Sequence, residues 1–198
     1  MPGSIFDRDR LIIKSLDERK NQIIFRDKMV TPAFRPDNLP DETLRIIKET
    51  ASRIIKARKD NKPVILAFGA HTIKNGLSPV LTELIRRGWV THLATNGAGI
   101  IHDWEFAFQG ESGENVRENT AKGQFGIWQE TGLFLNLAIT VGAFENLGYG
   151  ESVGKMISRE GLDIPDMQFL ADQAVKNIKA DPGYAASAAD LLGTIKKR

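Results

Sequence analysis

The feature that most constrains the fold is a pair of short apolar runs with a helical segment between them. The runs are PVILAF (63–68) and WVTHLAT (89–95), and the segment between them includes SPVLTELIRRG (78–88). A continuous apolar run of this length is typical of a strand buried on both faces of a parallel sheet. Ser78 can cap the intervening helix, Pro79 suits its first turn and Gly88 can end it. The sequence therefore predicts a strand-helix-strand unit with two parallel strands.

The rest of the chain is predicted to be mostly helical. We expect an N-terminal arm over 1–38, the strand-helix-strand core over 39–110, a polar loop over 111–126 and helices over 127–198. The core opens with a helix from Pro40 to about Lys59, because apolar residues recur there at helical spacing. Together these segments predict a single α/β domain over 1–198. Two parallel strands do not bury themselves. Either helices and N-terminal strands complete the sheet, or the domain is incomplete and the chain is a fragment or a subunit that needs partners.

Composition excludes several classes of site. The 198 residues include no cysteine, so disulfides, thiolate metal sites and cysteine nucleophiles are excluded. The net charge of +2 is too small to indicate a nucleic acid or an anionic membrane as partner. The longest apolar stretch (132–144) is too short to span a bilayer. We expect a cytoplasmic protein that acts on a small molecule, with no nucleic-acid or membrane partner.

Small residues follow both predicted strands. They are Gly69 and Ala70 after the first strand, and Thr95, Asn96, Gly97, Ala98 and Gly99 after the second. Ligands of open α/β sheets bind beyond the carboxyl ends of the strands, and the N–H groups that begin a helix can hold a phosphate or carboxylate. These seven residues are therefore candidate cofactor-binding residues, although tight turns also favour small residues. Neither turn matches a dinucleotide-binding GxGxxG motif or a P-loop.

Two of the three histidines, His71 and His102, also lie just beyond a predicted strand. Imidazole titrates near neutral pH, so either can serve as a general acid or base, and neighbouring strands would turn both toward one cleft. Asp103 can orient His102 or bond a ribose hydroxyl. His71, His102 and Asp103 are thus the candidate catalytic residues, with capping or turn roles as the alternative. Together with Glu105 they match no metal motif, and no metal is predicted.

The order of these features resembles the deoxyhypusine synthase family. The resemblance spans roughly residues 63–127 and includes NGL (75–77), the run that ends at Thr95, the Gly-rich turn and VREN (116–119). That family uses NAD to transfer an aminobutyl group from spermidine to a lysine of a translation factor, on a Rossmann-like parallel sheet, and forms tetramers. The resemblance implies a Rossmann-like parallel sheet flanked by helices, NAD at the Gly-rich turns, and a homo-oligomer, either dimer or tetramer.

The chain also departs from the family pattern. The family has Thr-Ser-Asn where this chain has Gly69, Ala70 and His71, and only Asp103 represents its acidic pair. The glycine-rich stretch that carries the family's catalytic lysine has no counterpart, so modification of a translation factor does not follow. The resemblance implies a divergent relative, or an N-terminal portion of one, that performs NAD-dependent dehydrogenation or transfer on an amine or other small molecule. Two alternatives remain: a hydrolase or lyase that uses His71 and His102 without nicotinamide, and a non-catalytic oligomerising domain that binds a ligand.

Overall fold

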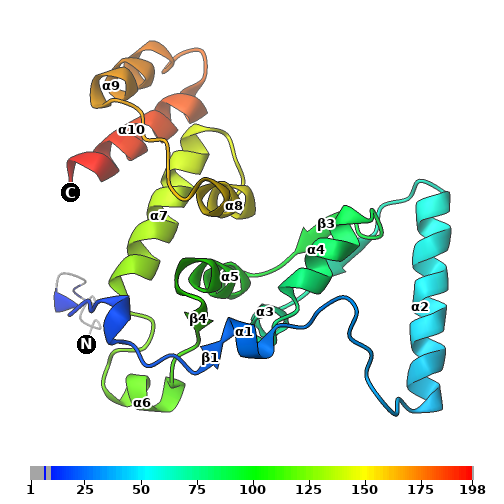
Figure 1. Ribbon diagram of the computed structural model, residues 1–198. Coiled ribbons are helices and arrows are strands. Elements are labelled where there is room, and N and C mark those ends of the chain that lie inside the picture. The colour runs from blue at the N-terminus through cyan, green and yellow to red at the C-terminus, as the bar shows by residue number, and fades with distance from the viewer. Residues whose placement is uncertain (1–6, 8–9, 198) are drawn as a thin grey trace, which may run out of the picture. The chain divides into compact units, whose positions relative to one another are not determined.

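The computed structural model describes residue 7 and residues 10–197 (Figure 1). The chain divides into two compact units, residues 21–113 and residues 1–20 together with 114–198. Each unit has an apolar core of its own. Helices account for 59% of the structure, and the strands of the described part are four short ones in two separate pairs. This division by contacts does not test whether residues 1–198 fold together as a single domain, so the single domain stays a prediction.

The unit of residues 21–113 contains both pairs of strands. Its elements are β1 (Ile23–Ile24), α1 (Phe25–Lys28), α2 (Asp41–Lys59), β2 (Ile65–Ala67), α3 (Ala70–Lys74), α4 (Ser78–Arg86), β3 (His92–Ala94), α5 (Gly97–Gln109) and β4 (Glu111–Ser112). β2 and β3 run parallel, and β1 and β4 pair antiparallel. The core consists of Ile73, Leu81 and Phe106, one from each of α3, α4 and α5. The two helices that follow the parallel strands, α3 and α5, therefore pack against each other.

The predicted parallel pairing is confirmed, but the predicted Rossmann-like parallel sheet flanked by helices is wrong. In the described residues no third strand joins β2 and β3. Ile65 is 65% exposed, so the apolar run of 63–68 is not buried on both faces. The physical reason lies in the rest of the chain, where apolar residues recur at helical rather than strand spacing and are buried between helices.

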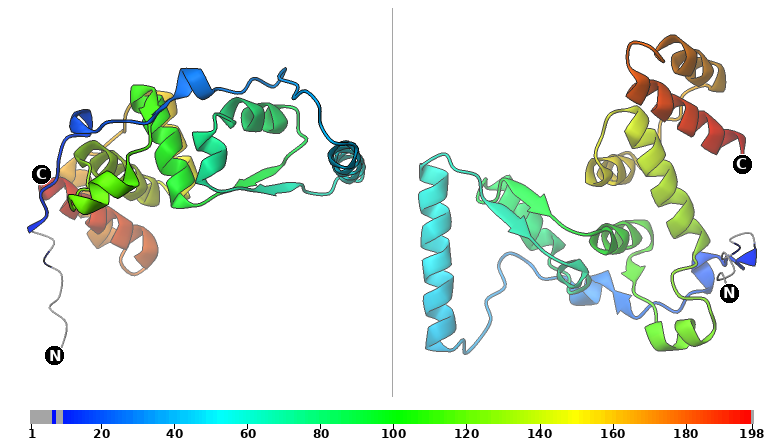
Figure 2. Two further views of the ribbon diagram at one scale, coloured as in Figure 1. Left: turned by 90° about the horizontal axis from the view of Figure 1, so that it is seen from below. Right: turned by 180° about the vertical axis from the view of Figure 1, so that it is seen from behind.

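The second unit is built from helices. They are η2 (Leu16–Glu18), α6 (Val116–Ala121), α7 (Gln129–Phe144), α8 (Tyr149–Arg159), α9 (Met167–Lys176) and α10 (Pro182–Lys196). α9 and α10 pack side by side (Figure 2), and both contribute to a core that includes Phe144, Leu170 and Leu191. The carboxylate of Glu130 accepts hydrogen bonds from the Ser15 hydroxyl and the Leu16 N–H, which attaches η2 to α7. The helices predicted over 127–198 are confirmed.

The predicted polar loop over 111–126 is wrong in part, because this segment contains β4 and α6. The side-chain oxygen of Asn115 accepts a hydrogen bond from the Glu118 N–H at 3.1 Å and caps the first turn of α6. Asparagine followed three residues later by glutamate is a helix-start pattern, and the polar composition of the segment masked it.

We expect Gly142 of α7 to tolerate no side chain. A Cβ atom there would lie 2.5 Å from Ser152 Cβ of α8, so Gly142→Ala should lower the free energy of unfolding by about 1–3 kcal/mol in urea denaturation. The control is Gly132→Ala in the same helix, where nothing lies within 4 Å and alanine should stabilise by up to about 1 kcal/mol. Stabilisation by both substitutions would contradict close packing of α7 on α8.

Candidate functional site

The parallel register of β2 and β3 brings the two predicted cofactor-binding turns together. Ala67 lies opposite Ala94, and the Phe68 N–H donates to the Ala94 carbonyl at 2.9 Å, so the two strands end level with each other. The turns that begin at Gly69 and Thr95 therefore leave the same edge of the strand pair. Since α3 and α5 also pack against each other, the candidate residues of both turns share one region of this unit.

The turn after β3 is shaped mainly by its own residues. The side-chain oxygen of Asn96 accepts a hydrogen bond from the Gly99 N–H at 3.0 Å and caps α5. Gly99 is buried, and a Cβ atom there would collide with the Thr95 hydroxyl oxygen. The side chain of Asn96 and the backbone N–H of Gly99 thus serve the turn itself, whereas Ala98 is exposed in the first turn of α5. The N–H groups of a first helical turn have no acceptor within their helix, so Gly97 and Ala98 are the residues here that suit an anionic ligand.

The turn after β2 is open. Gly69 precedes α3 without a side-chain cap, and nothing lies within 4 Å of the position that its Cβ would take. Ala70 is half-buried at the first position of α3, and His71 beside it is exposed. His71 is therefore accessible to solvent at this edge of the strands.

His102 has a different environment, because it belongs to a hydrogen-bonded chain with two buried residues. Its Nδ1 atom lies 2.6 Å from the Ser112 hydroxyl oxygen, and the Ser112 hydroxyl donates to the Glu105 carboxylate at 2.5 Å. Ser112 is fully buried and Glu105 is 1% exposed, whereas the His102 side chain is 19% exposed. The chain therefore runs from a buried carboxylate in α5, through a hydroxyl in β4, to an imidazole with partial access to solvent.

When Glu105 is ionised, the direction of these hydrogen bonds fixes the tautomer of His102. A serine hydroxyl has one proton, and that of Ser112 is donated to Glu105, so its oxygen accepts from the Nδ1–H of His102. A neutral imidazole protonated on Nδ1 carries its lone pair on Nε2. Ser112 and Glu105 thus orient the ring and make Nε2 the basic nitrogen, which is the role of the orienting group beside a general base.

Asp103 lies against α4. Its carboxylate accepts a hydrogen bond from the Ser78 hydroxyl at 3.1 Å. Ser78 was predicted to cap α4, but the residue at the N-cap is Leu77 and Ser78 is the first residue of the helix. Desolvation by the surrounding protein raises the pKa of Asp103 above its ordinary value, and the hydrogen bond from Ser78 offsets part of this shift. The Asp103 carboxylate is therefore hydrogen-bonded to α4, and the Nδ1 atom of His102 is hydrogen-bonded to Ser112 of β4.

Sequence reasoning missed Ser112 and the orienting role of Glu105. A signal for Glu105 existed, because residues three apart on a helix share a face and His102 and Glu105 have that spacing. Ser112 had no comparable signal, since it is ten residues from His102 and reaches it because the chain folds back after Gly110, the left-handed C-cap of α5. Lys74 of α3 lies near the end of β4. Its Cε atom is 3.9 Å from the point that a Cβ atom of residue 113 would occupy, and Gly113 directly follows Ser112.

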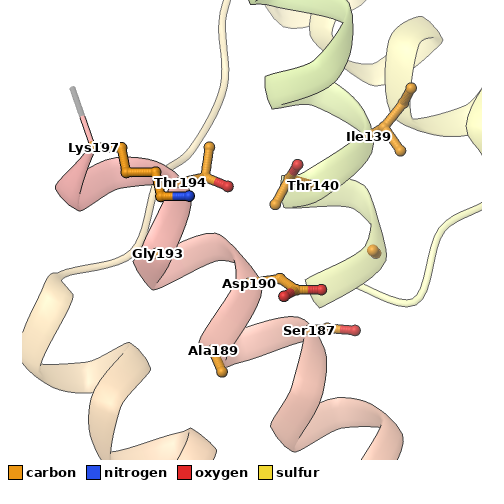
Figure 3. A pocket seen from close by; sticks show the side chains of 9 residues that line it. Ile139, Thr140, Ser187, Ala189, Asp190, Gly193, Thr194 and Lys197 are labelled. Carbon is orange, nitrogen blue, oxygen red and sulfur yellow. The ribbon is translucent and has the colours of Figure 1, made fainter. Parts of the chain in front are cut away.

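A separate pocket of about 450 Å³ lies in the helical unit, between α7 and α10 (Figure 3). Asp190 and Thr194 of α10 and Thr140 of α7 line it, and Asp190 projects from α10 toward α7. None of the candidate residues predicted from the sequence lines this pocket. It therefore offers no support for the predicted site, whose residues all belong to the other unit.

Comparison with known proteins adds no assignment. No protein-family model matches the chain, and neither the curated proteins nor the solved structures give a significant match. In the residues that the structure describes, no three or more histidine, aspartate or glutamate side chains are grouped as metal ligands. None of the described helices has the length and apolar character that a bilayer crossing requires.

We expect Ser112→Ala to destabilise the protein by about 1–3 kcal/mol, because it removes the hydroxyl to which both the half-buried His102 and the buried Glu105 are hydrogen-bonded. Urea denaturation followed by circular dichroism measures the change. Ser78→Ala is the matched control, since its hydroxyl also bonds a carboxylate but at an exposed position, and its expected cost is below about 0.5 kcal/mol. Equal costs for the two substitutions would contradict the buried bridge.

We expect Asp103→Asn to stabilise the protein at pH 7 and to have no such effect at pH 3. The raised pKa means that the folded state binds this proton more tightly than the unfolded chain. The stability that this carboxyl contributes is therefore present below its unfolded pKa and is lost as the pH rises through the folded pKa. Neighbouring atoms desolvate the carboxyl although the residue still reaches solvent, so the gain at pH 7 should be about 0.5 kcal/mol or less. Urea midpoints at both pH values measure it, and destabilisation at pH 7 would contradict it.

Proposed function

We propose that residues 21–113 bind a small molecule at the carboxyl ends of β2 and β3, with NAD or a related nucleotide as the ligand and His102 as the general acid–base group. The observation that carries this proposal is the hydrogen-bonded chain His102–Ser112–Glu105. A buried carboxylate and a buried hydroxyl are costly to desolvate, and both are used here to fix one imidazole. Such an arrangement favours acid–base chemistry over a purely structural histidine.

The proposed ligand site is the region beyond the two aligned strands. Gly69 leaves open space, and the first turn of α5 presents backbone N–H groups at Gly97 and Ala98. These features suit a phosphate-bearing ligand, and the amine of Lys74 adds a cation on the β4 side. NAD itself is proposed from the resemblance of these turns to those of deoxyhypusine synthases, since the Rossmann-like sheet that usually accompanies it is not present in the described residues.

Each component of the proposed reaction has a defined role. NAD, when bound, supplies an acceptor for hydride. The Nε2 atom of His102 accepts the proton that an amine or alcohol substrate loses as it is oxidised, and Ser112 and Glu105 hold the ring as its charge changes. Glu105 stabilises the resulting imidazolium, because its carboxylate lies 3.8 Å from Nδ1.

A hydrolase or lyase without nicotinamide is the second candidate function. It is favoured by the same chain of residues, because an oriented imidazole can activate water or remove a proton from carbon without any cofactor. In this alternative His71, exposed at the same edge of the strands, is available as a second acid or base. The two functions differ in whether nicotinamide nucleotides bind.

The nucleotide is tested by thermal denaturation and calorimetric titration with NAD, NADH and ADP-ribose. A ligand at about one hundred times its dissociation constant should stabilise the protein by roughly 2.7 kcal/mol. Ala98→Asp should weaken binding at least about tenfold, because it places a negative charge in the first turn of α5, while the same charge favours the helix dipole and preserves folding. Ala98→Ser is the neutral control. Absence of binding by all three nucleotides would refute the nucleotide part of the proposal.

The acid–base role is tested separately with His102→Gln, and with His92→Gln as a control on an exposed histidine of β3. Nucleotide binding that persists in His102→Gln, together with turnover reduced by about 10²–10⁴-fold, supports the proposed role. Turnover on a substrate without nicotinamide would favour the hydrolase or lyase. Equal activity of wild type and His102→Gln would refute the role of His102, and a ligand bound without any turnover would indicate a non-catalytic binding domain.

A further inference from the structure

α2 (cyan in Figure 1) is the longest helix of its unit. It is 19 residues long and has no buried residue. The side chains of Leu44, Ile47 and Ile55 are 37%, 50% and 41% exposed. Most of the stability of a helix in a protein comes from packing of its apolar face, so a helix with these exposed side chains lacks the contacts that would normally hold it.

The exposed side chains form one apolar stripe along the helix. At 100° per residue, the stripe consists of Leu44, Ile47, Ala51, Ile54 and Ile55, of which Ile54 is half-buried and the others are exposed. The opposite face carries Glu42, Arg45, Glu49 and Arg53, which form ion pairs within the helix, such as Arg45 with Glu42 at 2.7 Å. The polar face is thus satisfied within α2, whereas no described residue buries the apolar stripe.

The C-terminal end of α2 is attached to its unit through Arg58. The guanidinium of this residue donates to the carbonyl of Gly88 at 2.8 Å and to that of Lys62 at 2.6 Å. The attachment therefore holds the end of the helix and leaves the stripe uncovered along its length. A partner that covers the stripe must present apolar side chains at the same helical spacing.

We propose that α2 pairs with α2 of a second copy of this chain, in an antiparallel and two-fold symmetric dimer. In the register that aligns the two stripes, Leu44 lies against Ile54 and Ile55 of the second copy, and Ile47 lies against its Ala51. The same contacts repeat with the copies exchanged, as an isologous interface requires. The stripe supplies the apolar seam that helix pairs use. This proposal does not depend on the proposed function.

The charges beside the stripe favour the antiparallel orientation. Asp41, Lys48 and Lys59 border one side of it, near the start, middle and end of the helix. Antiparallel pairing places Asp41 beside Lys59 of the second copy at both ends, and Lys48 beside the uncharged Ser52. Parallel pairing would place each of these charges beside the opposite, uncharged border of the stripe, which consists of Thr43, Thr50 and Ala57. It would also align the two helix dipoles unfavourably. The apolar stripe and the charges therefore indicate the same register.

Sedimentation equilibrium of the full chain tests the proposal, with Ile47→Glu as the disrupting variant. Ile46→Glu is a matched control, because Ile46 is 51% exposed, is adjacent in sequence and lies off the stripe. We expect a dimer whose dissociation constant rises about a hundredfold or more in Ile47→Glu and less than about threefold in Ile46→Glu. A monomer at all concentrations up to 1 mM, or equal effects of the two variants, would overturn the proposal.

Charge reversal tests the orientation without changing the stripe. Asp41→Lys and Lys59→Asp should each weaken the dimer, and the double variant should restore it. Because the chain has no cysteine, single cysteines give an independent readout. Leu44→Cys mixed with Ile55→Cys should form a disulfide-linked heterodimer, whereas Leu44→Cys alone should not cross-link, since its two copies lie about 15 Å apart. Efficient cross-linking of Leu44→Cys alone would indicate a parallel pair and overturn the antiparallel dimer.

Discussion

The parallel pairing of β2 and β3 is the constraint on which the rest of the 21–113 unit depends. Three paired residues in each strand fix the level at which both strands end, and this level fixes where α3 and α5 begin. Because α3 and α5 then pack on α4 through Ile73, Leu81 and Phe106, the strand register also determines the core. The position of His102 follows from the same geometry, as it lies in the second turn of α5.

Local patterns in the sequence predicted most of the elements. Apolar spacing located α2, α4 and the C-terminal helices, with Pro79 and Gly88 marking the two ends of α4, and the apolar runs located β2 and β3. These signals act within a few residues and do not depend on the rest of the fold. The same reasoning failed at residues 111–126, where Asn115 caps α6 within a segment whose composition is typical of a loop.

The size and the type of the sheet could not be predicted from such patterns. An apolar run indicates a strand, but the number of strands that join it depends on distant segments, and here the remaining apolar residues, such as Leu170 and Leu191, belong to a helical core. The candidate site shows the same limit. Both turns were found because they follow strand ends, whereas Ser112 reaches His102 from a separate strand pair that no local pattern indicates.

The single proton of the Ser112 hydroxyl has a consequence for the chemistry of His102. With Glu105 ionised, that proton points to the carboxylate, and the imidazole is protonated on Nδ1. If Glu105 instead took up a proton and donated it to Ser112, the hydroxyl would turn toward the ring and Nδ1 would become the acceptor. The lone pair would then move from Nε2 to the inner nitrogen. The ionisation of one buried carboxyl thus selects which side of the ring can act as a base.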